Sequence, residues 1–165
     1  MLTHADTILL LRVLLAGVIG FLIGLQRETR GSPAGERTTA LLAVGVTALV
    51  GIDRIVLPAN SDRVIQGIIT GVGFLGVGVI VRTESRAVHG LTTAAGLWAV
   101  MAMSVLVGLG HEMLGAMLGV LILLLLVWPQ LPVLSRLSIA KRRTAQETSA
   151  EALTGTSPGD PPHDR

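Results

Sequence analysis

The sequence predicts an all-α fold: a polytopic bundle of transmembrane helices that crosses the bilayer five times. Half of the 165 residues are hydrophobic, and the mean hydropathy is +0.69. This composition leaves too little polar surface for a soluble domain of this size. The apolar residues are gathered in five runs, separated by short segments that contain charged residues, Gly or Pro. Such runs are typical of helices that cross a hydrocarbon core about 30 Å thick.

The five runs form a predicted transmembrane domain over residues 1–134. The run Val64–Val81 contains five glycines and is closed by Arg82, and its residues would rise about 27 Å as a helix. Asp53 and Arg54 interrupt the second run near its far end. Thr92 or Thr93 is placed to cap the start of the fourth helix. The spans are expected at about 8–25, 38–57, 64–81, 91–109 and 113–128.

Glycines indicate where the helices approach one another, because small residues let backbones come close in lipid. In the third span, three glycines fall on one side of the helix and two on nearly the opposite side. A helix with two glycine faces is predicted to lie at the centre of the bundle. The fifth span has one seam, Gly115 and Gly119, and is expected to pack on that side alone. The other glycines expected at helix contacts are Gly20, Gly24, Gly67, Gly71, Gly73, Gly76 and Gly78.

The distribution of Lys and Arg predicts the orientation, because cytoplasmic flanks carry an excess of these residues. With five spans, ten of them lie on the side of the first loop, the third loop and the C-terminus, whereas only Arg54 and Arg63 lie on the other side. The N-terminus is therefore expected outside the cell and the C-terminus in the cytoplasm. Residues 135–165 are basic at first and then rich in Thr, Ser, Gly and Pro, and a disordered cytoplasmic tail is expected.

Several classes of site are disfavoured by the sequence. Gly71–Gly76 matches the dinucleotide fingerprint, but it lies inside an apolar run without the strand and acidic residue that the motif needs. The four histidines have no metal-ligand spacing, and Asp53 and Asp62 are interpreted as solvated loop residues. The basic residues sit beside apolar runs rather than forming a patch with aromatics. We expect no cofactor, no metal and no nucleic-acid partner.

Two polar residues lie inside predicted spans. Gln66 is within one turn of the start of the third span and shares a side with Gly73. A buried amide in lipid either bonds across helices or lines a polar cavity, and both interpretations of Gln66 stay open. Arg12 lies about one turn inside the first span, where it either extends to the interface or forms a structural pair.

A group of charged and hydroxyl residues lies at span ends on the predicted cytoplasmic side. Each arginine taken singly is most simply an anchor to lipid headgroups. Taken together, the residues form a candidate site for an anion or a partner protein. With Gln66 added, the candidate functional residues are Arg27, Glu28, Arg37, Thr38, Gln66, Arg82, Thr92 and Thr93.

Five motifs in this order resemble those of the MgtC/SapB family of bacterial inner-membrane proteins. Gly24-Leu-Gln-Arg-Glu28 resembles the family's G-L-E-R-E, and Ala34-Gly-Glu-Arg-Thr38 resembles A-G-L-R-T. Residues 62–66, 73–80 and 90–98 resemble the end of D-P-x-R-I-A-A-Q, then G-F-L-G-A-G-V-I and G-L-x-T-A-A-x-L-W. Gln26 stands where the family usually has Glu, and Glu36 stands where it usually has an apolar residue. The tail is too short for the folded cytoplasmic domain of many relatives.

The resemblance implies a non-enzymatic inner-membrane protein with five spans and an external N-terminus. It implies regulation of other membrane machinery, such as ATP synthase and hence membrane potential, during adaptation to low magnesium and, in pathogens, survival inside macrophages. The partners expected are the lipid bilayer, other membrane proteins and a second copy of the chain. Two alternatives stay open: a small transporter or channel for magnesium or another solute, with Gln66 and Thr70 beside its path, and a scaffold that binds other spans.

Overall fold

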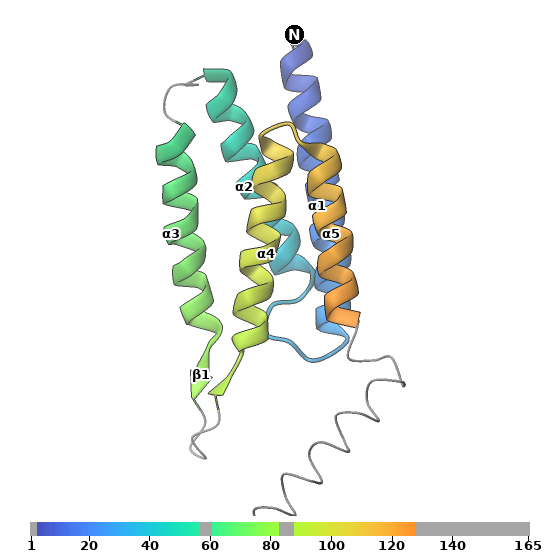
Figure 1. Cartoon of the computed structure of the whole chain (residues 1–165), viewed down its shortest axis with the longest axis vertical. Coiled ribbons are helices and arrows are strands. Elements are labelled where there is room, and N and C mark those ends of the chain that lie inside the picture. The colour runs from blue at the N-terminus through green and yellow to red at the C-terminus, as the bar shows by residue number, and fades with distance from the viewer. Residues whose placement is uncertain (1–2, 57–60, 83–87, 128–165) are drawn as a thin grey trace, which may run out of the picture. The chain divides into compact units, whose positions relative to one another are not determined.

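A computed structural model describes residues 3–56, 61–82 and 88–127, and Figure 1 shows the arrangement of its helices. Five helices are separated by short connections, and a hairpin of two very short strands joins the third helix to the fourth. The elements are α1 (His4–Glu28), α2 (Glu36–Val56), α3 (Ser61–Val79), β1 (Val81–Arg82), β2 (Val88–His89), α4 (Leu91–Gly108) and α5 (Glu112–Val127).

The predicted all-α membrane bundle is confirmed. Helices α1 to α4 are each long and apolar enough to cross a membrane, and α5 is a shorter apolar helix of 16 residues. Each predicted span coincides with one helix, although α1 extends three or four residues beyond its predicted span at both ends. The tail, residues 135–165, and the last residue of the fifth predicted span lie outside the described residues.

Local capping explains where α1 begins. The Thr3 hydroxyl accepts the Asp6 N–H at 3.2 Å, and the Asp6 carboxylate accepts the Thr3 N–H at 2.8 Å. This reciprocal capping box satisfies two backbone donors that a helix start leaves free. The helix therefore begins before the apolar run does, which hydropathy alone does not indicate.

The start of α4 corrects a prediction. Its N-cap is Gly90, at φ +92°, and no side-chain hydrogen bond caps the helix. Neither Thr92 nor Thr93 acts as the cap, because both already lie inside the first turn. Antiparallel pairing of Val81 with His89 and of Arg82 with Val88 brings the chain back from α3 to α4. Glycine suits this corner because its left-handed conformation costs other residues energy.

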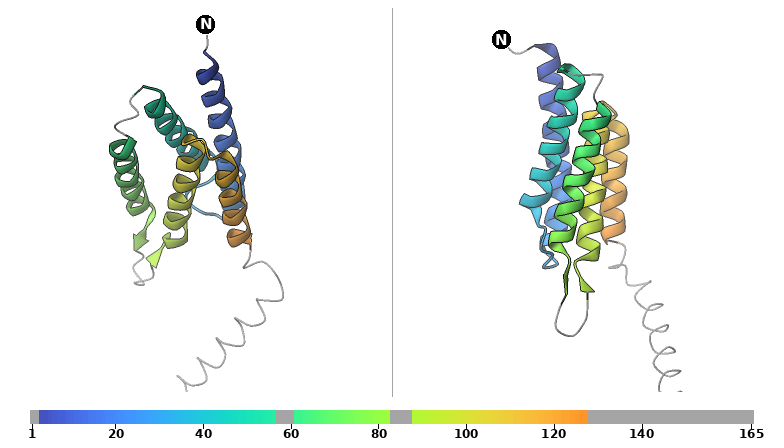
Figure 2. Two further views of the ribbon diagram at one scale, coloured as in Figure 1. Left: turned by 45° about the horizontal axis from the view of Figure 1, so that its top comes forward. Right: turned by 90° about the vertical axis from the view of Figure 1, so that its left-hand side faces the viewer.

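The central helix is α4, and the prediction that the glycine-rich third span would be central is wrong. Helix α4 packs against α1, α2 and α3, and it lies between α3 and α5 in Figures 1 and 2. Half of its residues are buried, compared with 17% in α3. Glycine spacing shows that a close approach is sterically allowed, but it does not show that a neighbour makes that approach.

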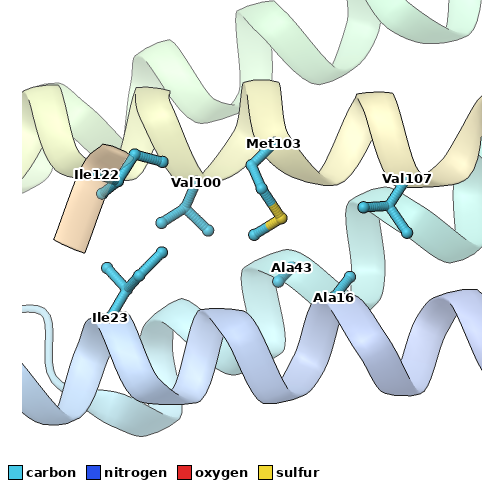
Figure 3. Close-up of a cluster of buried hydrophobic side chains, with 7 residues drawn as sticks. All are labelled: Ala16, Ile23, Ala43, Val100, Met103, Val107 and Ile122. Atoms are coloured by element: carbon cyan, nitrogen blue, oxygen red, sulfur yellow. The ribbon is translucent and has the colours of Figure 1, made fainter. Parts of the chain in front are cut away.

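The apolar core has two parts, both built against α4. The first joins α4 to α1, α2 and α5, and Figure 3 shows its buried side chains, with Met103 pointing from α4 toward Ala43. The second joins α4 to α2 and α3, around residues such as Val50, Val72 and Leu97. Between α2 and α4 the Thr47 hydroxyl donates to the Ser104 carbonyl at 3.1 Å. Burial against α4 therefore holds the other helices together.

The predicted glycine contacts divide sharply between helices. A Cβ atom added at Gly24 would lie 2.4 Å from the Glu36 Cα, and one at Gly20 would lie 2.8 Å from the Ala43 Cβ, so both glycines lie where α1 meets α2. Gly76 has only ordinary contact with Ala94. The remaining α3 glycines have no neighbour within 4 Å in the part of the chain that the structure describes: Gly67, Gly71, Gly73 and Gly78.

The fifth helix packs as its sequence predicts. Its buried residues are Gly115, Gly119 and Ile122. A Cβ at Gly115 would meet Val107 of α4, and one at Gly119 would meet Ile19 of α1. Leu118, Leu123 and Leu126 are half-buried against the core. Other large side chains of α5, such as Met117 and Leu121, are exposed, as expected for a helix that faces lipid elsewhere.

The glycine contacts give a first prediction. We expect Gly24→Ala to lower the free energy of unfolding by about 1–3 kcal/mol, because its new methyl group overlaps backbone atoms of the α2 start. The matched control is Gly71→Ala, whose methyl group enters open space and should change stability by about 1 kcal/mol or less. Denaturant unfolding of the purified protein in detergent measures both variants, and equal effects would contradict the assigned contact.

Candidate functional site

Most of the predicted functional residues belong to one end of the bundle, here called the Arg27 end. It comprises the end of α1, the connection 29–35, the start of α2, and the hairpin with the start of α4. These segments lie together at the bottom of Figure 1. The fold therefore gathers residues that are far apart in sequence around the last turn of α1.

Arg27 is the most enclosed charged residue of this end, with only 6% of its surface exposed. Its Nη2 donates to the Ser32 hydroxyl and to the Thr93 hydroxyl, both at 2.7 Å, and the two hydroxyls are 3.0 Å apart. A Cβ at Gly96 would lie 3.4 Å from Nη1, at ordinary van der Waals distance, so the guanidinium packs against this part of α4. Arg27 thus ties α1 and the following connection to the first turn of α4.

The charge of Arg27 has no acidic counterpart in the described ranges. The one ion pair found there joins other residues, and the hydroxyls that Arg27 bonds are neutral. The buried Nε has no hydrogen-bond partner. The position of Arg27 in the last turn of α1 favours a cation, because helix carbonyls point that way. That partial charge offsets only part of the cost of burying a full one.

Glu28 bonds the start of α2 and does not pair with Arg27. Its Oε2 accepts the Glu36 N–H at 3.2 Å, which satisfies a donor that the first turn of α2 leaves free. A Cβ at Gly35 would lie 2.2 Å from the same oxygen, so Gly35 allows the carboxylate to come near. A carboxylate at a helix N-terminus is also favoured electrostatically.

The remaining predicted residues fall into two groups. Arg37, Thr38 and Thr92 are exposed and make no side-chain hydrogen bond among the described residues, whereas the side chain of Arg82 lies outside them. Gln66 is also exposed, so its amide is not buried within the single chain, and its role stays a prediction. The structure therefore brings together Arg27 and Thr93 and leaves Arg37, Thr38, Gln66 and Thr92 exposed.

Ser32 is the site residue that sequence reasoning missed. It lies in a connection crowded with Gly, Pro and charged residues, where a serine is ordinary. Its backbone N–H donates to the Arg27 carbonyl at 3.2 Å, so the chain folds back over the end of α1. No local pattern indicates that this turn places the hydroxyl on the guanidinium.

The opposite end of the bundle holds a second polar group. Arg12 Nε donates to Glu112 Oε1 at 2.5 Å, which is the structural pair anticipated for Arg12. Arg54 donates to the Leu109 carbonyl, and a cavity of about 310 Å³ lies between these arginines and residues of α1, α2 and the α4–α5 turn. These bonds fasten the turn to α1 and α2.

Asp53 corrects the interpretation of a solvated loop residue. It lies inside α2 with 4% of its surface exposed, and its Oδ1 has no hydrogen-bond partner. Asp62, in the first turn of α3, is exposed as expected. In the described residues, no group of three or more acidic or histidine side chains is arranged to hold a metal ion.

An apolar groove of about 480 Å³ runs between α2 and α3. Glycines on both helices, Gly45, Gly67 and Gly71, form part of its wall, together with larger residues such as Leu41 and Leu49. No atom of another element lies within 4 Å of a Cβ added at any of the three glycines. The groove therefore leaves backbone accessible along α3.

These features define an integral membrane protein: a helix bundle with an apolar exterior and polar contacts at its two ends. The chain belongs to the MgtC family, because the sequence model of that family matches residues 13–131. The resemblance drawn from the five motifs is thereby confirmed.

Curated relatives of known name are similar over the same region. Protein MgtC of Salmonella typhimurium strain LT2 is 42% identical over 102 residues, which are 62% of this chain and 44% of the relative. Protein SrpB of Synechococcus elongatus is 37% identical over 121 residues, 63% of this chain and 65% of the relative. Protein MgtC of Brucella abortus is 44% identical over 96 residues, 58% and 40% of the two chains.

The similar region covers only part of this chain and part of each relative. The chain spans less than half the length of the MgtC proteins just named. No solved structure is significantly similar to it. The family membership thus rests on sequence, and the arrangement of the Arg27 end comes from the structure of this chain.

The Arg27 contacts give a prediction with a matched control. Thr93→Val keeps the side-chain shape but removes a hydroxyl bonded to a buried cation, and we expect it to lower the free energy of unfolding by about 1–3 kcal/mol. Thr92→Val alters an exposed neighbour and should stay within about 0.5 kcal/mol of the wild type. Thermal and denaturant unfolding in detergent compare the two variants. A Thr93→Val variant as stable as the wild type would show that the bond contributes little.

Proposed function

We propose that this chain is a non-enzymatic protein of the bacterial inner membrane that crosses the bilayer several times and regulates other membrane machinery by binding it. The process proposed is adaptation to low magnesium, through effects on ATP synthase and membrane potential. In a pathogen the same role would extend to survival inside macrophages. Membership of the MgtC family supports the proposal.

The observation that carries the proposal is the apolar groove beside α3. Its glycines face open space in the single chain, although small residues at four-residue spacing are what helices in lipid use for close contact. Gly67 and Gly71 lie one turn apart, and Gly45 faces them from α2. A transmembrane helix seated there would gain backbone contact along α3.

The occupant proposed is a helix of another membrane protein, because regulation requires contact with a partner. Nearby side chains such as Leu41, Leu49 and Ile69 are exposed and apolar, which suits a partner that lies within the hydrocarbon. Burial of apolar surface contributes little between helices in lipid, so packing at the glycines supplies the affinity.

Growth of a strain that lacks this chain, measured across a magnesium titration, tests the proposal. We expect a growth defect and an altered membrane potential confined to low magnesium, both restored by the intact chain. Gly71→Leu fills the groove and should abolish the rescue. Gly73→Leu, on the other side of α3 and also in open space, is the control and should rescue normally at equal abundance.

Two outcomes would contradict the proposal. A deletion without any defect at low magnesium would remove the role in magnesium adaptation. Equal rescue by both leucine variants would remove the groove from the mechanism. Cross-linking from α3 in intact membranes distinguishes a second copy from another protein, because a homodimer gives a product of twice the chain mass.

Transport is a second candidate, and Asp53 is the observation that favours it. Ionisable residues within membrane helices commonly mark ion paths, because burying an unpaired charge is costly. Asp53 is buried and has an oxygen without a partner, and it would be the residue to hold a magnesium ion or another cation.

Flux into proteoliposomes tests this candidate. Transport through Asp53 predicts that Asp53→Asn lowers cation flux at least about tenfold, the effect of losing about 1.4 kcal/mol of stabilisation. Asp62→Asn, which changes an exposed carboxylate in α3, should leave the flux unchanged. An intact chain that passes no cation under any gradient would exclude transport by the chain alone.

A further inference from the structure

We propose that the Arg27 end binds an oxyanion of the phosphate class. The site consists of the Arg27 guanidinium, the Ser32 and Thr93 hydroxyls and the first turn of α4. As a regulatory site it rests on the proposed function, whereas the binding itself can be measured on the isolated chain.

Arg27 carries a buried charge that no acidic residue of the described ranges balances. Arg27 is 94% buried, counted from its 6% exposure, and arginine does not lose its proton in proteins. Its hydrogen-bond partners are neutral hydroxyls, and no carboxylate among the described residues pairs with it. A buried cation without a counter-charge is costly. An anion from outside this part of the chain would relieve that cost.

The site also has hydrogen-bond donors without acceptors. The buried Nε–H of Arg27 has no acceptor, and it lies on the same edge of the guanidinium as Nη2, which bonds both hydroxyls. When one of the two hydroxyls donates to the other across 3.0 Å, the second keeps a free hydrogen. These donors lie together because Nη2 contacts both oxygens at 2.7 Å.

The start of α4 adds backbone N–H donors to the site. The first N–H groups of any helix lack intrahelical acceptors. This helix of 18 residues has Gly90 at its N-cap, so no side chain caps these groups either. Thr93, in that first turn, bonds the Arg27 guanidinium, so the positive end of the helix dipole and the buried cation meet at one place. Helix starts of this kind bind phosphate and sulfate groups.

The chemistry of the donors selects the class of ligand. A guanidinium, hydroxyls and backbone N–H groups approach from different elements, and an anion with several oxygens and up to two negative charges can accept from all of them. Free phosphate and the phosphate group of a phospholipid share this chemistry. Arg30, exposed three residues away, is not one of these donors.

The test uses the full chain in micelles of an uncharged, phosphate-free detergent, titrated with inorganic phosphate at constant ionic strength. Phosphorus NMR and the thermal midpoint report binding. We expect saturable binding by the intact chain and binding about tenfold weaker in Ser32→Ala and Thr93→Val, the effect of losing one charge-assisted hydrogen bond. Thr92→Val and Arg30→Gln are the controls and should bind within about twofold of the wild type.

A second arm separates the two sources of phosphate. Nanodiscs containing phosphatidic acid are added, and retained lipid is counted by native mass spectrometry. Lipid retained by the intact chain but not by Ser32→Ala assigns the site to a phospholipid even where free phosphate does not bind. Absence of both ligands, or binding that Ser32→Ala and Thr93→Val leave unchanged, overturns the proposal. Such a result leaves the growth phenotype and the groove of α3 untouched, so the two proposals fail separately.

Discussion

The close approach of α1 and α2 at Gly20 and Gly24 is the contact on which the arrangement of the Arg27 end depends. At Gly24 the space for a side chain is taken by backbone of the α2 start, so the last turn of α1 is held against the first turn of α2. Glu28 can then accept the Glu36 N–H, and the connection between the helices folds back over Arg27. Without this contact, the guanidinium would not be enclosed.

Helix α4 completes the enclosure because it is the common neighbour of the other spans. Thr93 bonds Arg27 at one end of α4, Ser104 accepts from Thr47 midway, and the Leu109 carbonyl accepts from Arg54 just beyond the other end. Polar groups inside a membrane protein must be satisfied by the protein, since lipid offers no partners. These bonds fix the position of α4 along the bundle axis, which apolar contacts alone define poorly.

The sequence predicted the helices well because hydropathy reports length and burial in lipid directly. It predicted helix–helix contacts less well, because only some of the expected glycine contacts form in the described residues. Gly24 and Gly71 each follow another glycine by four residues, yet only Gly24 lies against the backbone of another helix. The spacing is the same, but the identity of the neighbour depends on tertiary packing. Asp53 was assigned to solvent from its position near a span end, but it is buried inside α2. Arg27 and Thr93 were recognised, whereas Ser32 depended on a turn that has no sequence signature.

The groove beside α3 and the Arg27 end are joined by a short stretch of chain. Helix α3 ends at Val79, and the hairpin leads directly to α4, whose third residue is Thr93. A partner helix that shifts α3 would act on the hairpin and thus on the first turn of α4. Thermodynamic linkage makes such an effect reciprocal, so an anion that fixes Thr93 against Arg27 would change the affinity of the groove for its partner by the same factor. If both proposed sites are occupied, each would then change the affinity of the other.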